Sequence, residues 1–347
     1  MYIKKILVIV VVLGAIGMGI FSWYIYDTAF SGNTAFNNDQ AHVYIPTNAT
    51  MHDVMEELEP LLRNADSFRA IANKKGYDTN IKPGHFIISR GMSNNDLVNT
   101  LRSRNIPINI KFNNQERLED LAGHISNQIE ADSISLLSAM REPEFLKEMG
   151  LNTDTALSLY IPNTYEFYWN SSANTFRERM KTEYERFWNA SRTEKAKALN
   201  LTREQVMSLA AIVQKETAKV DERPRVAGVY LNRLKTGMLL QADPTVIYAL
   251  KLASGDFNQV IKRVLFADLE IDSPYNTYKY AGVPPGPITM PDISSIDAVL
   301  NPEIHDYYYF VADVTNFGYH KFAKNLAQHN VNKVEYVRWV NSQGLKR

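Results

Sequence analysis

Residues 209–248, LAAIVQKETAKVDERPRVAGVYLNRLKTGMLLQADPTVIY, combine an apolar helical stripe, one carboxylate and a polar segment that contains proline. Thr202 and Gln205 lie just before this stretch at the spacing of a capping box, which predicts that a helix begins there. Apolar residues then recur at helical spacing, at Val206, Leu209, Ala210 and Val213. Glu216 occupies the next position of that stripe. The pattern therefore predicts a largely buried helix that ends with Glu216 on its core-facing side.

A carboxylic acid on an apolar surface is suited to proton transfer, because desolvation disfavours its charged form and raises its pKa. The residues leave a second interpretation open. Glu216 could instead form a structural ion pair with Arg223 or Arg225, which follow it closely in the sequence. Structural ion pairs also place carboxylates at such positions. The two interpretations differ in whether Glu216 is neutral or charged near neutral pH.

Composition limits the classes of protein that this chain can belong to. Its 347 residues are enough for two or more domains. Lys and Arg total 38, as do Asp and Glu, so no excess of positive charge indicates a nucleic-acid partner. The absence of cysteine excludes disulfides, thiolate metal sites and a lipoprotein anchor. No metal-binding, acyl-transfer, nucleotide or dinucleotide motif is present, so we expect no metal and no cofactor.

The N-terminal region predicts a membrane anchor. Residues 6–26, ILVIVVVLGAIGMGIFSWYIY, form an uncharged apolar run long enough to cross a bilayer as a helix. Lys4 and Lys5 precede it, so the positive-inside rule places residues 1–5 in the cytoplasm. A cleaved signal peptide is the alternative, but the run is longer than usual and no typical cleavage site follows. We expect residues 27–40 to be a linker, and the rest of the chain to lie in the periplasm.

Residues 41–105 predict a small module of mixed helices and strands. A short strand near Val43 precedes a helix with Thr50 as its candidate N-cap. A second helix covers residues 67–75, and Gly76 is the candidate residue at its end. A strand at residues 85–89 and a third helix with Ser93 as candidate N-cap complete the module.

Several blocks of the chain resemble the YceG-like endolytic murein transglycosylases, the MltG family. Around Glu216 the matching residues are 215–217 (KET), 222–223 (ER), 226–227 (VA), 230–234 (YLNRL), 237–238 (GM), 240–241 (LQ), 243–246 (DPTV) and Tyr248. Further on they are 275–278 (YNTY), 282–288 (GVPPGPI), 309–312 (YFVA), 320–322 (HKF), Asn325 and 329–330 (HN). One departure is Gln214, where many members of the family have glutamate.

This resemblance implies an α+β architecture: a transmembrane helix, a LysM-like module at 41–105, a connecting region at 106–190 and a catalytic domain at 191–347. A strand-like run at 106–111 and a helix-rich part follow the module, and Glu166 is a second acidic candidate that the match does not mark as catalytic. The alternative for the module is a spacer that holds the catalytic part at a set height.

The resemblance also implies a reaction. Glu216 would protonate the glycosidic oxygen between N-acetylmuramic acid and N-acetylglucosamine in nascent glycan strands, and would then accept a proton from the C6 hydroxyl as a 1,6-anhydro ring closes. Most glycosidases need two carboxylates, whereas this reaction needs one. Such cleavage would terminate strand elongation, beside peptidoglycan synthases at the inner membrane. Candidate substrate-binding residues are Gln241, Asp243, Thr245, Asn276, Tyr278, His320, Asn325 and His329.

Two other functions stay open at this point. A cell-wall glycoside hydrolase would use Glu216 as acid and Asp243 or Glu222 as base. A peptidoglycan-binding scaffold would use the module at residues 41–105, with Glu216 in an ion pair.

Overall fold

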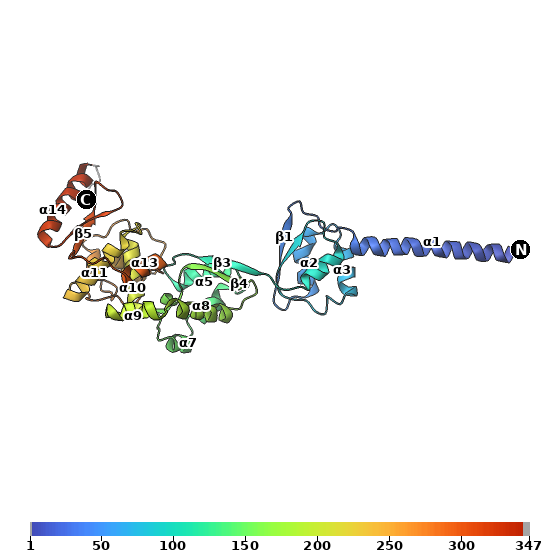
Figure 1. The fold of residues 1–347 in the computed structure, drawn as a ribbon, viewed down its shortest axis with the longest axis horizontal. Coiled ribbons are helices and arrows are strands. Elements are labelled where there is room, and N and C mark those ends of the chain that lie inside the picture. Colours follow the sequence, from blue (N-terminus) through green and yellow to red (C-terminus); the bar gives the residue numbers. More distant parts are fainter. Residues whose placement is uncertain (1, 343–347) are drawn as a thin grey trace. The chain divides into compact units, whose positions relative to one another are not determined.

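The computed structural model describes residues 2–342 and divides into two compact units (Figure 1). The first unit extends to Ile110 and also includes Asn127–Ala131 and Tyr165–Ser172. The second contains Lys111–Ser126, Asp132–Thr164 and the described chain from Ala173 onward. Residues 106–190, predicted as a connecting region, therefore contribute to both units. Helices dominate beside three two-stranded sheets, β1–β2, β3–β4 and β5–β6, so the predicted α+β class is confirmed.

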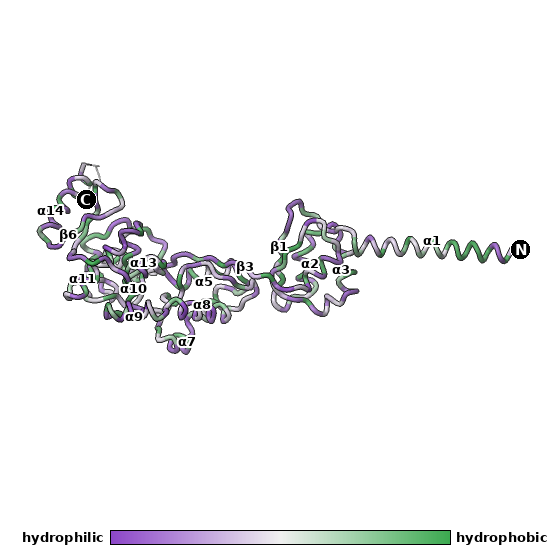
Figure 2. The backbone as a smooth tube through the Cα atoms, in the orientation of Figure 1, coloured by the Kyte–Doolittle hydropathy of each residue, from purple (hydrophilic) through white to green (hydrophobic). Residues whose placement is uncertain are grey.

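The first unit begins with one long helix, α1 (Tyr2–Phe30). Its residues are almost all exposed, and most of them are apolar. Figure 2 shows the apolar part of α1 in green, with paler and purple segments toward its ends. It is the one helix within residues 2–342 that is long and apolar enough to cross a membrane. The predicted apolar helix is thus present, and its membrane-spanning role stays a prediction.

The small module follows α1 in the order that the sequence predicts. Its elements are β1 (Gln40–Ile45), α2 (Met51–Leu58), η1 (Glu59–Leu61), α3 (Ala65–Lys74), β2 (Gly84–Ser89) and α4 (Asn94–Leu101). Strands β1 and β2 pair antiparallel, with Val43 opposite Phe86. Thr50 and Ser93 both form capping boxes, so these two predicted N-caps are confirmed. Gly76, at φ +65°, follows the end of α3 as the sequence predicts.

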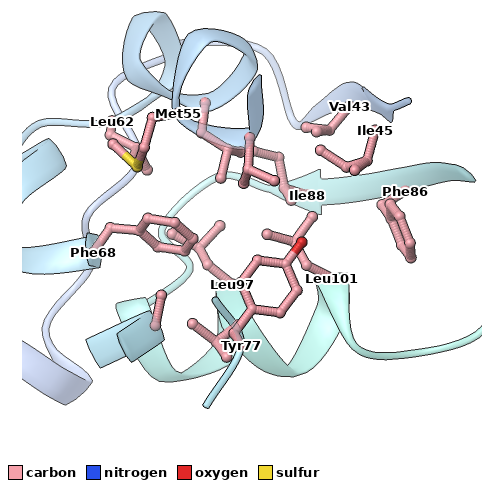
Figure 3. Packing of buried hydrophobic residues seen from close by; sticks show 14 residues of the cluster. Val43, Ile45, Met55, Leu62, Phe68, Tyr77, Phe86, Ile88, Leu97 and Leu101 are labelled. Atoms are coloured by element: carbon pink, nitrogen blue, oxygen red, sulfur yellow. The ribbon is translucent and has the colours of Figure 1, made fainter. Parts of the chain in front are cut away.

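The core of the module is a single cluster of apolar side chains. Figure 3 shows Phe68, Tyr77 and Leu97 pointing toward the apolar side of β1 and β2. These side chains are fully buried. Burial of a large apolar side chain contributes about 1.5–3 kcal/mol, so such a cluster gives the module its own hydrophobic core.

The second unit carries most of the helices. They are α5 (Leu118–Ser126), α6 (Ser133–Met140), α7 (Pro143–Glu148), η2 (Ala156–Leu159), α8 (Ala173–Phe187), α9 (Ala190–Ala198), α10 (Arg203–Glu216), α11 (Arg223–Thr236), α12 (Asp243–Ser254), η3 (Asp268–Glu270), α13 (Ile293–Leu300) and α14 (Leu326–Ser342). Strands β5 (Tyr309–Ala312) and β6 (His320–Ala323) pair antiparallel. Strands β3 (Pro107–Phe112) and β4 (Asn163–Tyr168) also pair, and each contributes residues to both units.

Helix α10 is the central helix of the second unit and packs against α11, α12 and α13. The Thr202–Gln205 capping box is present at its start, as predicted. Every residue from Val206 to Val213 is buried, because neighbouring helices cover α10 on several sides. Gln214 fastens α10 to α13: its side-chain oxygen accepts hydrogen bonds from the Asp292 backbone N–H at 2.6 Å and the Ser295 hydroxyl at 3.2 Å. This position requires a hydrogen-bond acceptor, and both glutamine and glutamate provide one.

Candidate active site

Glu216 is the last residue of α10, and the packing of that helix determines where its carboxyl group lies. Its side chain is half-buried, and its Oε1 accepts a hydrogen bond of 2.7 Å from the Tyr230 hydroxyl. Tyr230 lies on α11, which packs directly against α10, and only 1% of its surface is exposed. The Glu216 carboxyl is therefore held by a buried neutral donor rather than left free in solvent.

Desolvation of this site raises the pKa of Glu216 to about 7. The hydrogen bond from Tyr230 opposes the rise, because it favours the charged carboxylate. The charge of Asp243 raises the pKa further, while His320 and Arg233 lower it. Desolvation outweighs the opposing contributions, so a large fraction of Glu216 is protonated at neutral pH. A carboxyl group with a pKa near the working pH is suited to give and take a proton.

The alternative of an ion pair with Arg223 or Arg225 is wrong, because both arginines bind other partners. Arg223 Nη1 contacts both carboxylate oxygens of Asp292 at 2.8 Å. Arg225 Nε contacts both oxygens of Glu303 at 3.0 Å. No ion pair of Glu216 is found in residues 2–342. Contacts with the N-cap of α13 and with the segment after that helix therefore keep both arginines away from Glu216.

The buried Glu222 pairs with the partly buried His320 in the same unit. One Glu222 oxygen accepts the His320 backbone N–H at 2.7 Å, and the other lies 2.8 Å from His320 Nδ1. Although burial acts to raise the pKa of Glu222, these bonds hold it below its usual value. The His320 ring also contacts Phe310, which in turn contacts Tyr230 edge-to-face with ring centres 5.9 Å apart. His320 is thus placed among the residues around Glu216, and both oxygens of Glu222 have partners.

Asp243 begins α12 and is exposed. Its Oδ1 accepts a hydrogen bond of 2.5 Å from the Tyr278 hydroxyl. The charge of Asp243 acts to raise the pKa of Glu216, and Glu216 is close enough for its own charge to act on Tyr278. Gln241 is exposed in the turn before α12 at φ +48°, a left-handed conformation that few residues other than glycine adopt. Its backbone N–H donates to the Thr277 carbonyl at 3.0 Å, and the residue is exposed. Asp243, Tyr278 and Gln241 therefore remain candidates for substrate contact.

Thr245 and Asn276 are placed differently, since both are completely buried. Thr245 Oγ1 donates to the Ala242 carbonyl at 2.7 Å and lies 2.8 Å from Thr277 Oγ1. Asn276 Nδ2 donates to the carbonyls of Leu269 and Ile271 at 2.8 Å each. Their polar atoms are used inside the protein, so this placement assigns them a positioning role for the loops that carry Gln241 and Tyr278.

Asn325 and His329 lie at the start of α14. Asn325 Oδ1 accepts the backbone N–H of Gln328 at 2.9 Å, which is the geometry of a helix cap. The His329 ring stacks on Tyr309 at 5.3 Å, and burial lowers its pKa. His329 Nδ1 is buried with no hydrogen-bond partner among the described residues. Residues 2–342 contain no group of three or more His, Cys, Asp or Glu side chains placed to hold a metal ion.

Two residues of the site were not among the predicted candidates. Tyr230 holds the Glu216 carboxyl, and Arg233 acts on it through its charge. Arg233 is buried, and its guanidinium donates to the backbone carbonyls of Tyr308 and Leu240 at 2.7 and 2.6 Å. The YLNRL block contains both residues, but their spacing alone does not show that they lie beside Glu216.

Replacement of Tyr230 by phenylalanine removes the hydrogen bond that favours ionised Glu216. We expect the pKa of Glu216 to rise further above 7, so that the alkaline limb of the pH–rate profile moves to higher pH. The same bond stabilises the ionised Glu216 that forms when the proton is donated. Its loss should therefore lower kcat/KM about 10- to 100-fold, the usual contribution of a hydrogen bond to a charged group. Tyr160→Phe is the matched control, since the buried Tyr160 hydroxyl has no partner among the described residues. An unshifted profile would contradict the role of Tyr230.

The geometry defines a site built around one half-buried carboxyl group on a helix of a mixed α+β unit. The sequence model of the YceG-like family matches residues 43–335, so the chain belongs to this family and the resemblance seen in its motifs is confirmed.

Named relatives agree with this membership. The chain is 27% identical over 322 residues to an endolytic murein transglycosylase of Bacillus subtilis, covering 87% of this chain and 86% of that protein. It is 26% identical over 328 residues to an endolytic murein transglycosylase of Streptococcus pneumoniae, where it spans 58% of the relative's length. A crystal structure of a YceG-like protein from Listeria monocytogenes matches with a TM-score of 0.57 and 28% identity. That match covers 85% of this chain and 99% of the other.

Proposed function

We propose that this chain is an endolytic lytic transglycosylase of murein and that Glu216 is its single catalytic acid and base. The observation that carries the proposal is the half-buried carboxyl of Glu216, held by Tyr230 with no ion pair within the described residues. Desolvation raises its pKa to about 7, so protonated and ionised forms are both accessible at neutral pH. The names of the relatives from Bacillus and Streptococcus support murein as the substrate.

In the proposed mechanism, the protonated Glu216 first donates its proton to the oxygen of the bond between N-acetylmuramic acid and N-acetylglucosamine. The leaving sugar departs with that proton. Glu216, now ionised, then accepts the proton of the muramic acid C6 hydroxyl as its oxygen attacks C1 and closes the 1,6-anhydro ring. Arg233 and His320 favour the ionised form between the two steps. No water is consumed, and the enzyme returns to its initial protonation state.

A glycoside hydrolase is the second candidate, because one observation favours it. Asp243 is exposed and close enough to Glu216 to raise its pKa, so a second carboxylate is available as a base for water. Glu222 is less suited to this role, since both of its oxygens bind His320. The scaffold hypothesis required Glu216 in an ion pair, and the pairings of Arg223 and Arg225 with other residues count against it.

Helix α1 supports a location at the membrane. We propose that it anchors the chain in the cytoplasmic membrane, with residues 1–5 inside the cell and the catalytic unit on the outer side, where nascent strands are found. The small module has the predicted order of strands and helices, which is consistent with a LysM-like, glycan-binding role. Cleavage beside the synthases would terminate the growth of glycan strands.

Product analysis distinguishes the two enzymes. We expect the full-length protein in detergent micelles to convert uncrosslinked glycan strands into fragments that end in 1,6-anhydromuramic acid. Mass spectrometry would show that such fragments are lighter by one water than hydrolysis products. Products that contain the added water would instead identify a hydrolase, and Asp243→Asn should then abolish cleavage. Intact strands would contradict both enzymatic functions.

A further inference from the structure

A hollow of about 280 Å³ lies in the second unit, outside the set of residues that contact the Glu216 carboxyl. Pro244, Ile247 and Tyr248 of α12 give it apolar and aromatic surface. Lys215 from α10, Lys251 from α12 and Glu116, just before α5, give it charged groups. A site of this kind, with apolar walls and a few convergent charges, is typical of a ligand subsite.

The charges in this hollow do not cancel. Glu116 accepts from both lysines, since its Oε1 lies 2.8 Å from Lys215 Nζ and its Oε2 lies 2.8 Å from Lys251 Nζ. Burial acts to raise the pKa of Glu116, but the two ammonium groups hold it below its usual value, so the carboxylate is ionised. Two positive charges therefore share one negative charge, which leaves a net positive charge in the hollow.

The lysines retain the capacity to bind a further anion. An ammonium group has three donors, and each lysine here donates to one acceptor among the described residues, Glu116. Only 13% of the Lys251 side chain is exposed, so its position is fixed by packing. The apolar walls lower the local dielectric constant and strengthen the attraction of an anion.

A neighbouring hollow of about 320 Å³ differs from the first in how its positive charges are paired. It shares Glu116 and Tyr248 with the first, and it contains Arg117 and Arg141. Each of these arginines has a carboxylate of its own: Arg117 lies 2.6 Å from Asp120, and Arg141 lies 2.5 Å from Glu119. The positive charges of the second hollow are therefore matched one to one, whereas those of the first are not.

The chain connects the first hollow directly to the candidate active site. Lys215 immediately precedes Glu216 in α10, and Pro244 immediately follows Asp243, whose charge acts on Glu216. The hollow is thus lined by the direct chain neighbours of two residues of the candidate active site.

We propose that Lys215 and Lys251 bind a carboxylate of the short peptides that branch from the muramic acid residues of murein. This inference rests on the proposed function and adds a specificity determinant to it. The lysine pair would select strands that still carry their peptides over strands from which the peptides have been removed. Glu116 positions the two ammonium groups and moderates their affinity.

The test measures binding in full-length protein that carries Glu216→Gln, in detergent micelles, so that no strand is cleaved. The probes are fluorescently labelled glycan strands with their peptides and the same strands after enzymatic removal of the peptides. Lys251→Met is expected to weaken binding of peptide-bearing strands about tenfold, the loss of one bond between charged groups, and to leave peptide-free strands unchanged. Equal weakening of both strands, or no weakening, would overturn the proposal.

Glu116→Gln provides a test that a folding defect cannot imitate. It removes the carboxylate that neutralises one lysine, so peptide-bearing strands should bind more tightly, and the gain should disappear at high salt. Weaker or unchanged binding would count against the proposal. Lys197→Met, which removes an exposed lysine of α9 paired with Glu194, is the matched control and should bind like the parent protein. If wild-type protein leaves all strands intact, the proposed function fails, while these binding comparisons still decide the role of the lysines.

Discussion

Replacement of Glu216 by glutamine is expected to reduce the rate of glycan cleavage by about 10²–10⁴-fold, the usual contribution of general acid–base catalysis. Glutamine keeps the size and polarity of the side chain but cannot transfer a proton. In the wild-type protein the cleavage rate should fall as the pH rises above about 7, because the pKa of Glu216 is about 7 and its protonated form starts the reaction. The measurement is kcat/KM on uncrosslinked strands from pH 5 to pH 9.

The same substitution has a predictable effect on stability. The pKa of Glu216 is about 7 in the native state, against 4.5 for an ordinary glutamate side chain, so the unfolded chain ionises first as the pH rises. The contribution of Glu216 to the free energy of unfolding is fully present below pH 4.5 and is lost as the pH rises through 7. The loss amounts to up to about 3 kcal/mol. Glu216→Gln should therefore raise the Tm relative to wild type at pH 8 and have little effect at pH 4.

The matched control for Glu216 is Glu204→Gln in the first turn of the same helix. It should retain full cleavage activity and lose only the small stabilisation that a carboxylate gives near a helix N-terminus, about 0.3–1 kcal/mol. Wild-type cleavage by the Glu216 variant would remove Glu216 from its catalytic role. A lower Tm at both pH values would show instead that the substitution damages the fold.

Replacement of Gly286 by alanine is expected to destabilise the second unit by about 3 kcal/mol, the upper part of the usual range for overpacking. An alanine Cβ at this position would lie 2.0 Å from the Asp154 carbonyl oxygen and 2.7 Å from its carbonyl carbon. Both are backbone atoms, which cannot move away without shifting the chain. Gly286 therefore has to be glycine because the backbone near Asp154 approaches it closely, and this explains the second glycine of the GVPPGPI block.

Thermal and urea-induced unfolding would measure this effect. Gly123→Ala in α5 is the control, because among the described residues nothing beyond its chain neighbours and the backbone of its own helix lies within 4 Å of its added Cβ. Since alanine favours helix over glycine, that variant should be neutral or more stable by about 0.5–1 kcal/mol. Equal stability of the Gly286 variant and the wild-type protein would show that the backbone near Asp154 can move to accommodate the added methyl group.

Local patterns predicted the elements around the site well. The Thr202–Gln205 box and the apolar stripe after it predicted α10 together with its capped start, and the Thr50 and Ser93 caps were predicted in the same way. The failures concern side chains whose partners lie far away in the sequence. Arg223 binds Asp292, and Asn276 is turned inward toward the carbonyls of Leu269 and Ile271, so their proximity to functional motifs was misleading.

The sequence by itself determined that α10 exists, that Glu216 ends its apolar face, and that the N-terminal residues form an apolar helix. These properties depend on spacing, capping and hydrophobicity within a few turns of chain, which the order of residues specifies directly. Only the tertiary structure decided that Tyr230, rather than an arginine, holds Glu216, and that Glu116 draws Lys215 and Lys251 together. Such contacts depend on how helices pack, since a hydroxyl or an ammonium group acts over a few ångströms of space whatever its separation in sequence.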